Sequence, residues 1–85
     1  MRLLIYMETA HHGLRAGELD VVNYRIYDED NDILLTKGEV SGEDVPSIIV
    51  DQLLPKAKRL VHVDLLEHIS VYRVSVINYP QKSTL

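Results

Sequence analysis

Hydrophobic and polar residues alternate along much of the chain, and the period of this alternation predicts the secondary structure. Within residues 19–28, Val22, Tyr24 and Ile26 occupy every second position, with mostly polar residues between them. This is the period-two pattern of a half-buried strand. An acidic turn follows, and residues 33–40 resume as a strand. The two strands are therefore expected to form a hairpin.

Three further apolar segments predict strands outside this hairpin. Arg2–Glu8 and Arg59–Val63 are short runs of strand-forming residues, which are typical of buried strands. Ser70–Tyr79 is a longer run that is rich in valine and predicts the final strand. The segment Thr9–Gly17 holds two glycines and a pair of adjacent histidines, and we expect it to form a loop.

One segment has the period of an amphipathic helix. Its apolar residues recur at intervals of three and four, so they share one face of a helix. Asp44 or Ser41 can cap the start of this helix. Pro55 disfavours helical geometry at the preceding residue, so we expect the helix to end or kink there. The residues of the apolar face are Val45, Ile48, Ile49 and Leu53.

These elements predict a single α+β domain over residues 1–80, followed by a polar tail at 81–85. The expected order is β-β-β-α-β-β, giving a mainly antiparallel sheet of about five strands with the helix on one face. One helix cannot cover both faces of such a sheet, and exposed edge strands invite pairing. We therefore expect the protein to act as a homodimer or as a subunit of a larger assembly.

Composition excludes several classes of site. The 85 residues contain no cysteine, which removes disulfides, thiolate metal sites and cysteine nucleophiles. No apolar run approaches the roughly 20 residues of a membrane span. The N-terminus also lacks the pattern of a signal peptide. We accordingly expect a cytoplasmic protein with no membrane partner.

Charge is unevenly distributed along the chain. Residues 18–51 contain ten acidic and two basic residues, a balance of −8, whereas the net charge is −4. The chain therefore lacks the basic face that direct binding of nucleic acid requires. We expect the acidic turn and the helix start to form a surface that docks on a basic protein partner. Alternatively, the protein imitates the charge of nucleic acid as an inhibitor. The surface consists of Asp28, Glu29, Asp30, Asp32, Glu43 and Asp44.

Three carboxylates offer an alternative, enzymatic interpretation. Glu8 ends the first predicted strand, Asp44 begins the helix, and Asp64 ends the predicted strand 59–63. If they converge at one rim of the sheet, they provide oxygen ligands for Mg²⁺ or Mn²⁺. Two such ions can clamp a phosphodiester for hydrolysis.

The order of these elements and the spacing of these acids resemble the ribonuclease H-like superfamily over residues 2–66. The resemblance rests on Ile5-Tyr6-Met7-Glu8, Gly42-Glu43-Asp44-Val45 and Val61-His62-Val63-Asp64. It implies a divalent-metal-dependent phosphodiesterase or nuclease, with Glu8, Asp44 and Asp64 as its catalytic carboxylates.

The histidines add a further candidate metal site. His62 and Asp64 share a face if their segment is extended, and with Glu8 they would form a histidine–carboxylate site of the kind that zinc or iron accepts. His11 and His12 have no recognised ligand spacing. No complete catalytic set and no phosphate-binding loop occur in the sequence. We therefore expect a non-enzymatic binding or regulatory protein without a cofactor.

Overall fold

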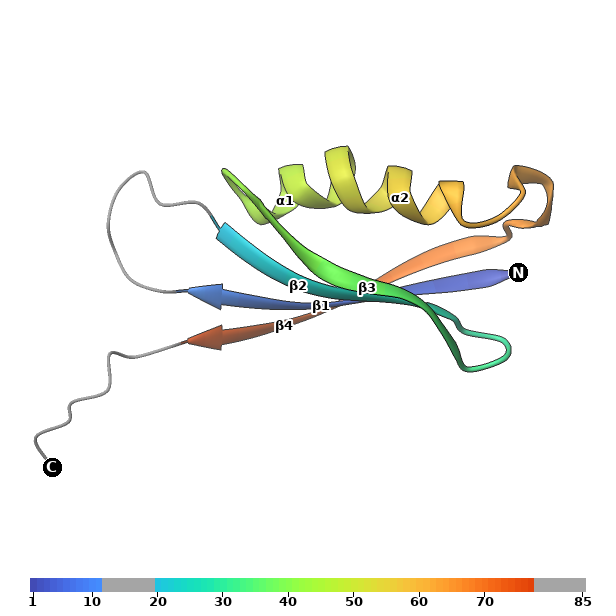
Figure 1. Ribbon diagram of the computed structural model, residues 1–85, viewed down its shortest axis with the longest axis horizontal. Helices are drawn as coiled ribbons and strands as arrows, with labels where there is room; N and C mark the ends of the chain where they lie inside the picture. Colours follow the sequence, from blue (N-terminus) through green and yellow to red (C-terminus); the bar gives the residue numbers. More distant parts are fainter. Residues whose placement is uncertain (12–19, 78–85) are drawn as a thin grey trace, which may run out of the picture.

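The computed structural model describes residues 1–11 and 20–77 of the chain (Figure 1). Four strands form one mixed sheet in the order β3-β2-β1-β4. β1 is antiparallel to β2, and β2 is antiparallel to β3, whereas β4 lies parallel to β1. The strands are β1 (Arg2–His11), β2 (Asp20–Asp28), β3 (Ile33–Gly42) and β4 (His68–Ile77).

A helical segment connects β3 to β4 and lies across one face of the sheet (Figure 1). It consists of α1 (Val45–Ile48), the π-helical turn η1 (Ile49–Leu53) and α2 (Leu54–Arg59). The short 3₁₀ helix η2 (Val63–Leu65) follows. Parallel strands need such a crossover connection, so this segment brings β4 beside β1. No helix in the described residues has both the length and the apolar character needed to cross a bilayer.

The core lies between the helical segment and one face of β1 and β2. Every second residue of these two strands is buried, as the period-two pattern predicts. The apolar face of the helix meets them, and Val45, Ile48 and Leu53 are buried as expected while Ile49 is half-buried. The buried hydrophobic residues are Leu3, Ile5, Met7, Val22, Tyr24, Ile26, Val45, Ile48, Leu53 and Ala57.

The predicted hairpin is confirmed, but the first strand is longer than predicted. β1 continues through residues 9–11, which the sequence pattern assigned to a loop. Thr9 is 1% exposed, and its hydroxyl lies 3.3 Å from that of Ser75 on β4. Pairing with β4 therefore extends the strand through a polar position. The rest of the predicted loop, including His12, and the predicted tail 81–85 lie outside the described residues.

In the described residues the sheet has four strands instead of about five, and it is mixed because β4 is parallel to β1 while the other two pairings are antiparallel. The predicted strand Arg59–Val63 is wrong: Arg59 ends α2, and Val63 begins η2. The predicted final strand is confirmed as β4, which begins two residues earlier than predicted, at His68, and residues 78–79 of the prediction lie outside the described residues. A short apolar run has no period that identifies it as a strand, and here these residues connect the end of α2 to the start of η2.

The helix continues past Pro55 because η1 widens the backbone just before it. A proline inside an α-helix removes one hydrogen-bond donor, and its ring clashes with the carbonyl of the fourth residue before it. In η1 the N–H of Leu54 donates to the carbonyl of Ile49, five residues earlier. This wider turn accommodates Pro55, so α2 runs on to Arg59.

Candidate functional site

The face of the sheet opposite the helix is not covered by any element of the described chain (Figure 1). We call it the open face. Its residues alternate with the core residues along each strand and therefore point away from the helix. They are Leu4, Tyr6 and Glu8 of β1, Val21, Asn23, Arg25 and Tyr27 of β2, Lys37 and Glu39 of β3, and Ser70, Tyr72 and Val74 of β4.

Strand register orders the centre of the open face into two rows of opposite charge. In one row Glu8 is paired with Asn23, and Asn23 is paired with Glu39. We call it the acidic row. The neighbouring basic row contains Arg25 and Lys37, together with two tyrosines. The full acidic row is Glu39, Asn23, Glu8 and Val74, and the full basic row is Lys37, Arg25, Tyr6 and Tyr72.

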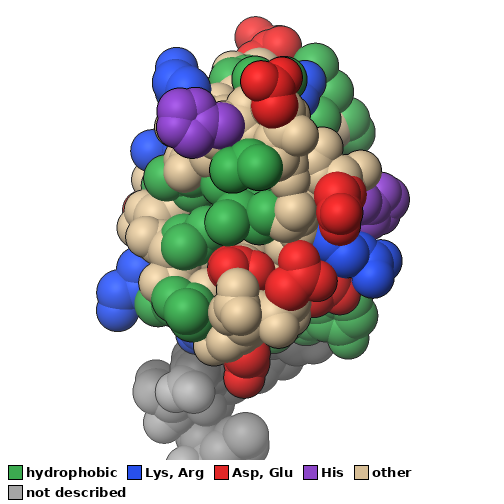
Figure 2. Space-filling view, turned by 90° about the vertical axis from the view of Figure 1, so that its right-hand side faces the viewer, with side chains coloured by type: hydrophobic (Ala, Val, Ile, Leu, Met, Phe, Trp, Pro, Cys, Tyr) green, Lys and Arg blue, Asp and Glu red, His purple; other side chains and the backbone are tan. Residues whose placement is uncertain are grey.

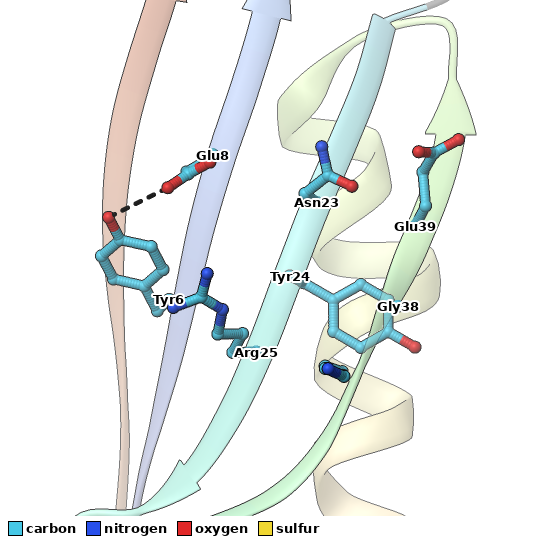
Figure 3. Close-up of a pocket in the computed structure, with 8 residues that line it drawn as sticks. Tyr6, Glu8, Asn23, Tyr24, Arg25, Gly38 and Glu39 are labelled. Atoms are coloured by element: carbon cyan, nitrogen blue, oxygen red, sulfur yellow. Dashed lines mark hydrogen bonds between the residues drawn. The ribbon is translucent and has the colours of Figure 1, made fainter.

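The aromatic side chains of the basic row contact each other and the neighbouring charges. The rings of Tyr6 and Tyr72 are stacked, with centroids 5.6 Å apart and planes 20° from parallel. The guanidinium carbon of Arg25 lies 5.6 Å from the centre of the Tyr6 ring, within reach of a cation–π interaction. The Tyr6 hydroxyl donates to Glu8 Oε1 at 3.4 Å (Figure 3). Burial and then the Glu8 carboxylate raise the pKa of Tyr6.

A hollow of about 490 Å³ lies along the centre of the open face (Figure 3). Tyr24 and Gly38 also line it between β2 and β3, although the Tyr24 side chain is buried on the helix face of the sheet. On that helix face, a Cβ atom at Gly38 would lie only 2.7 Å from the Tyr24 hydroxyl, so this close approach favours glycine. The hollow presents both signs of charge beside aromatic carbon, a mixture that suits the side chains of a protein. It is lined by Tyr6, Glu8, Asn23, Tyr24, Arg25, Lys37, Gly38 and Glu39.

The structure places the predicted acidic docking residues at two separate ends of β3. Asp28, Glu29, Asp30 and Asp32 belong to the β2–β3 turn, whereas Glu43 and Asp44 follow the far end of β3. Ten strand residues span about 33 Å, so the two groups do not form one surface. Figure 2 views the end of the molecule on the right-hand side of Figure 1, where a hydrophobic band has acidic side chains above and below it and Lys, Arg and His side chains at its margins.

Several of these acidic residues have structural roles. Asp28 is 4% exposed and accepts hydrogen bonds from the backbone N–H groups of Asp30 and Asn31 and from Asn31 Nδ2. The Asn31 side chain is the main reason that the pKa of Asp28 is lowered. Asp30 accepts a hydrogen bond from the N–H of Arg2 at 3.0 Å. The exposed Glu29, Asp32 and Glu43 keep their carboxylates at the surface.

Asp44 caps α1, as the sequence predicts. Its Oδ1 atom accepts a hydrogen bond from the N–H of Ser47 at 2.8 Å. Hydrogen bonds from the backbone and side chain of Ser47 lower the pKa of Asp44. The carboxylate therefore stabilises the start of the helix.

The alternative catalytic carboxylates are not brought together. Glu8 lies on the open face beside Val74, whereas Asp44 caps the helix that covers the other face. His62 and Asp64 lie in the η2 region before β4, whose first residue is six positions from Val74. Six strand residues span about 20 Å. In residues 1–11 and 20–77, no group of three His, Asp or Glu side chains is placed to hold a metal ion.

The ribonuclease H-like resemblance stays a prediction. Comparison with protein-family models, curated proteins and solved structures finds no match for this chain.

Among the residues of the two central rows, the sequence pattern singles out only Glu8, as a candidate catalytic carboxylate and metal ligand. The signal of the other residues was present in part, because the alternation that buries Tyr24 also turns Asn23 and Arg25 outward. Lys37 and Glu39 likewise stand two positions apart on the next strand. The rows appear only once the strand order and register are known, and β4 is needed to bring Tyr72 beside Tyr6.

Proposed function

We propose that this protein is a non-enzymatic binding protein that acts through a protein–protein interface on its open face. The observation that carries the proposal is the combination of stacked tyrosines, an arginine and half-buried apolar residues on a sheet face without cover in the described chain. Tyrosine and arginine are enriched at protein interfaces. Tyrosine joins a large apolar ring to a hydroxyl that forms hydrogen bonds at the margin of a contact.

The charge of the open face favours a protein partner over nucleic acid. Exposed aromatic residues on a sheet can stack on bases, but such surfaces also need basic side chains that follow the phosphates. Here Glu8 and Glu39 stand directly beside Arg25 and Lys37. The acidic row would repel a phosphate backbone, whereas a protein surface can present both signs of charge.

Site-specific photo-crosslinking tests this proposal. Benzoylphenylalanine replaces Tyr72, which is 56% exposed on the open face, or Val50, which is 62% exposed on the helix. Each variant is irradiated as the purified chain and in an extract of its source cells. We expect a discrete adduct from position 72 and none from position 50, and we expect excess wild-type chain to compete with it.

The mass of the adduct identifies the kind of partner. An adduct of twice the chain mass in the purified sample indicates self-association, whereas an adduct that forms only in the extract indicates another protein. The proposal is wrong if position 72 yields no adduct in either sample or reacts no more specifically than position 50.

A further inference from the structure

We propose that the occupant of the open face is a second copy of this chain, packed face to face around a two-fold axis that crosses the strands at their midpoints. This inference rests on the proposed function and names its partner. Its basis is the position of the two central rows on the strands and the sign of their charges.

The rows lie at the middle of every strand. β1 runs from residue 2 to residue 11, and its row residues are Tyr6 and Glu8. The corresponding pairs are equally central in β2, β3 and β4. When two sheets meet face to face, their two-fold axis lies in the plane between them. An axis that crosses the strands between the rows therefore overlaps the full length of both sheets.

This axis also places opposite charges against each other. It exchanges the two rows, so the acidic row of one copy faces the basic row of the other. On β3, Lys37 of each copy then faces Glu39 of the other, which gives two equivalent pairs. An axis parallel to the strands would instead place each row opposite itself. Because that axis also reverses the strand order, Glu39 would then face Val74 and Lys37 would face Tyr72, so neither charge of β3 would meet an opposite charge.

The charges of the two rows are not paired within the described chain. The ion pair found in residues 1–11 and 20–77 joins the N-terminal ammonium group to Glu67, at 3.8 Å. Within the same residues, neither Arg25 nor Lys37 has a carboxylate oxygen within 4.0 Å. Both basic side chains are exposed. In the proposed dimer the symmetry brings Glu39 opposite Lys37, and Asn23 opposite Arg25 with Glu8 and Glu39 on either side of it.

The open face is large enough for a specific dimer. Four strands spaced about 4.8 Å apart and about 30 Å long give a face of roughly 19 by 30 Å. Two such faces together cover roughly 1,100 Å², above the lower limit of about 1,000 Å² for specific interfaces. Packed sheets usually cross at about 30°. This rotation displaces the central rows less than the ends of the strands.

A charge-swap experiment tests the axis. The Lys37→Glu variant has acidic residues at both position 37 and position 39. The Glu39→Lys variant has basic residues at both positions. Each variant alone should weaken its homodimer at least about tenfold in Kd, because like charges then face each other. Mixing the two variants should restore a heterodimer. The double variant K37E/E39K should restore a homodimer. Sedimentation velocity measures all four samples.

Both residues are exposed on the edge strand β3, so the variants are expected to fold, and circular dichroism checks this. Lys58→Glu on the exposed side of α2 is the matched control and should leave the dimer unchanged. The inference is overturned if the wild type is monomeric, or if mixing the two variants restores no more dimer than either gives alone. A monomeric chain that still crosslinks to another protein through position 72 overturns only this inference and leaves the proposed function standing.

Discussion

The carboxylate of Asp28 holds the β2–β3 turn together. It accepts hydrogen bonds from the side chain and backbone of Asn31 and from the backbone of Asp30, and they hold its pKa below the ordinary value of about 4. The charged form therefore stabilises the folded state. This stabilisation is complete above the unfolded-state pKa and is lost as the pH falls through the lowered folded-state pKa.

We accordingly expect Asp28→Asn to lower the free energy of unfolding at neutral pH. The variant should also lose less stability than the wild type on acidification to about pH 3, because it lacks the Asp28 carboxylate, whose protonation destabilises the folded wild type. Urea unfolding across this pH range measures both effects. Asp32→Asn is the control, since Asp32 is exposed in the same turn and its φ of 53° suits asparagine. Identical pH profiles for the two variants would contradict this role of Asp28.

Gly38 and Tyr24 are matched across two strands. A methyl group at position 38 would meet the Tyr24 hydroxyl at 2.7 Å and Cζ at 3.0 Å, and this ring is 6% exposed. Gly38→Ala should therefore cost about 1–3 kcal/mol in the free energy of unfolding. Tyr24→Phe removes the nearest atom, so the double variant should lose less than the sum of the two single losses. Strictly additive losses would refute the steric explanation.

The separation of Glu8, Asp44 and Asp64 has a consequence for metal binding. Because these carboxylates lie on different faces and at different ends of the sheet, we expect Mg²⁺ or Mn²⁺ to leave the Tm unchanged. Thermal melting with and without each ion measures this. A rise in Tm that is lost in Glu8→Gln or Asp64→Asn would instead support the metal-dependent phosphodiesterase.

At the scale of elements, the stability of the domain depends on the contact between the helix and the sheet. Leu53 lies in η1 and is fully buried, whereas Val50 in the same turn is 62% exposed. Leu53→Ala should cost about 2–5 kcal/mol in the free energy of unfolding. Val50→Ala should change it by less than about 0.5 kcal/mol. Both are measured at one protein concentration, because the stability of the proposed dimer would depend on concentration. Equal losses of stability in the two variants would show that the buried face of the helical segment is assigned incorrectly.

The elements differ in how far the sequence could predict them. The β2–β3 hairpin and the buried face of the helix follow from local periodicity, and both are confirmed. The end of the helix does not follow, because the rule for Pro55 assumes regular α-helical geometry and η1 departs from it. The predicted strand 59–63 is wrong because its short apolar run has no period that identifies a strand, and these residues connect α2 to η2.

At the scale of the molecule, the candidate site depends on contacts between distant parts of the sequence. Alternation predicts that Arg25 points outward, but not that it lies beside Tyr6. The Tyr6–Tyr72 stack requires β4 to return parallel to β1 after the crossover. Local charge density pointed instead to the acidic turn and the helix start, which β3 separates. Pairing across strands, which periodicity does not encode, defines the open face.

The central claim is that this open face is covered by a second copy of the chain, and sedimentation equilibrium tests it most directly. The wild type should have the mass of two chains, and Tyr72→Glu, which places a carboxylate on the covered face, should have the mass of one. Val50→Glu, on the exposed side of the helix, should keep the mass of two. A wild type that has the mass of one chain at every concentration would contradict the account, as would a Tyr72→Glu variant that remains dimeric.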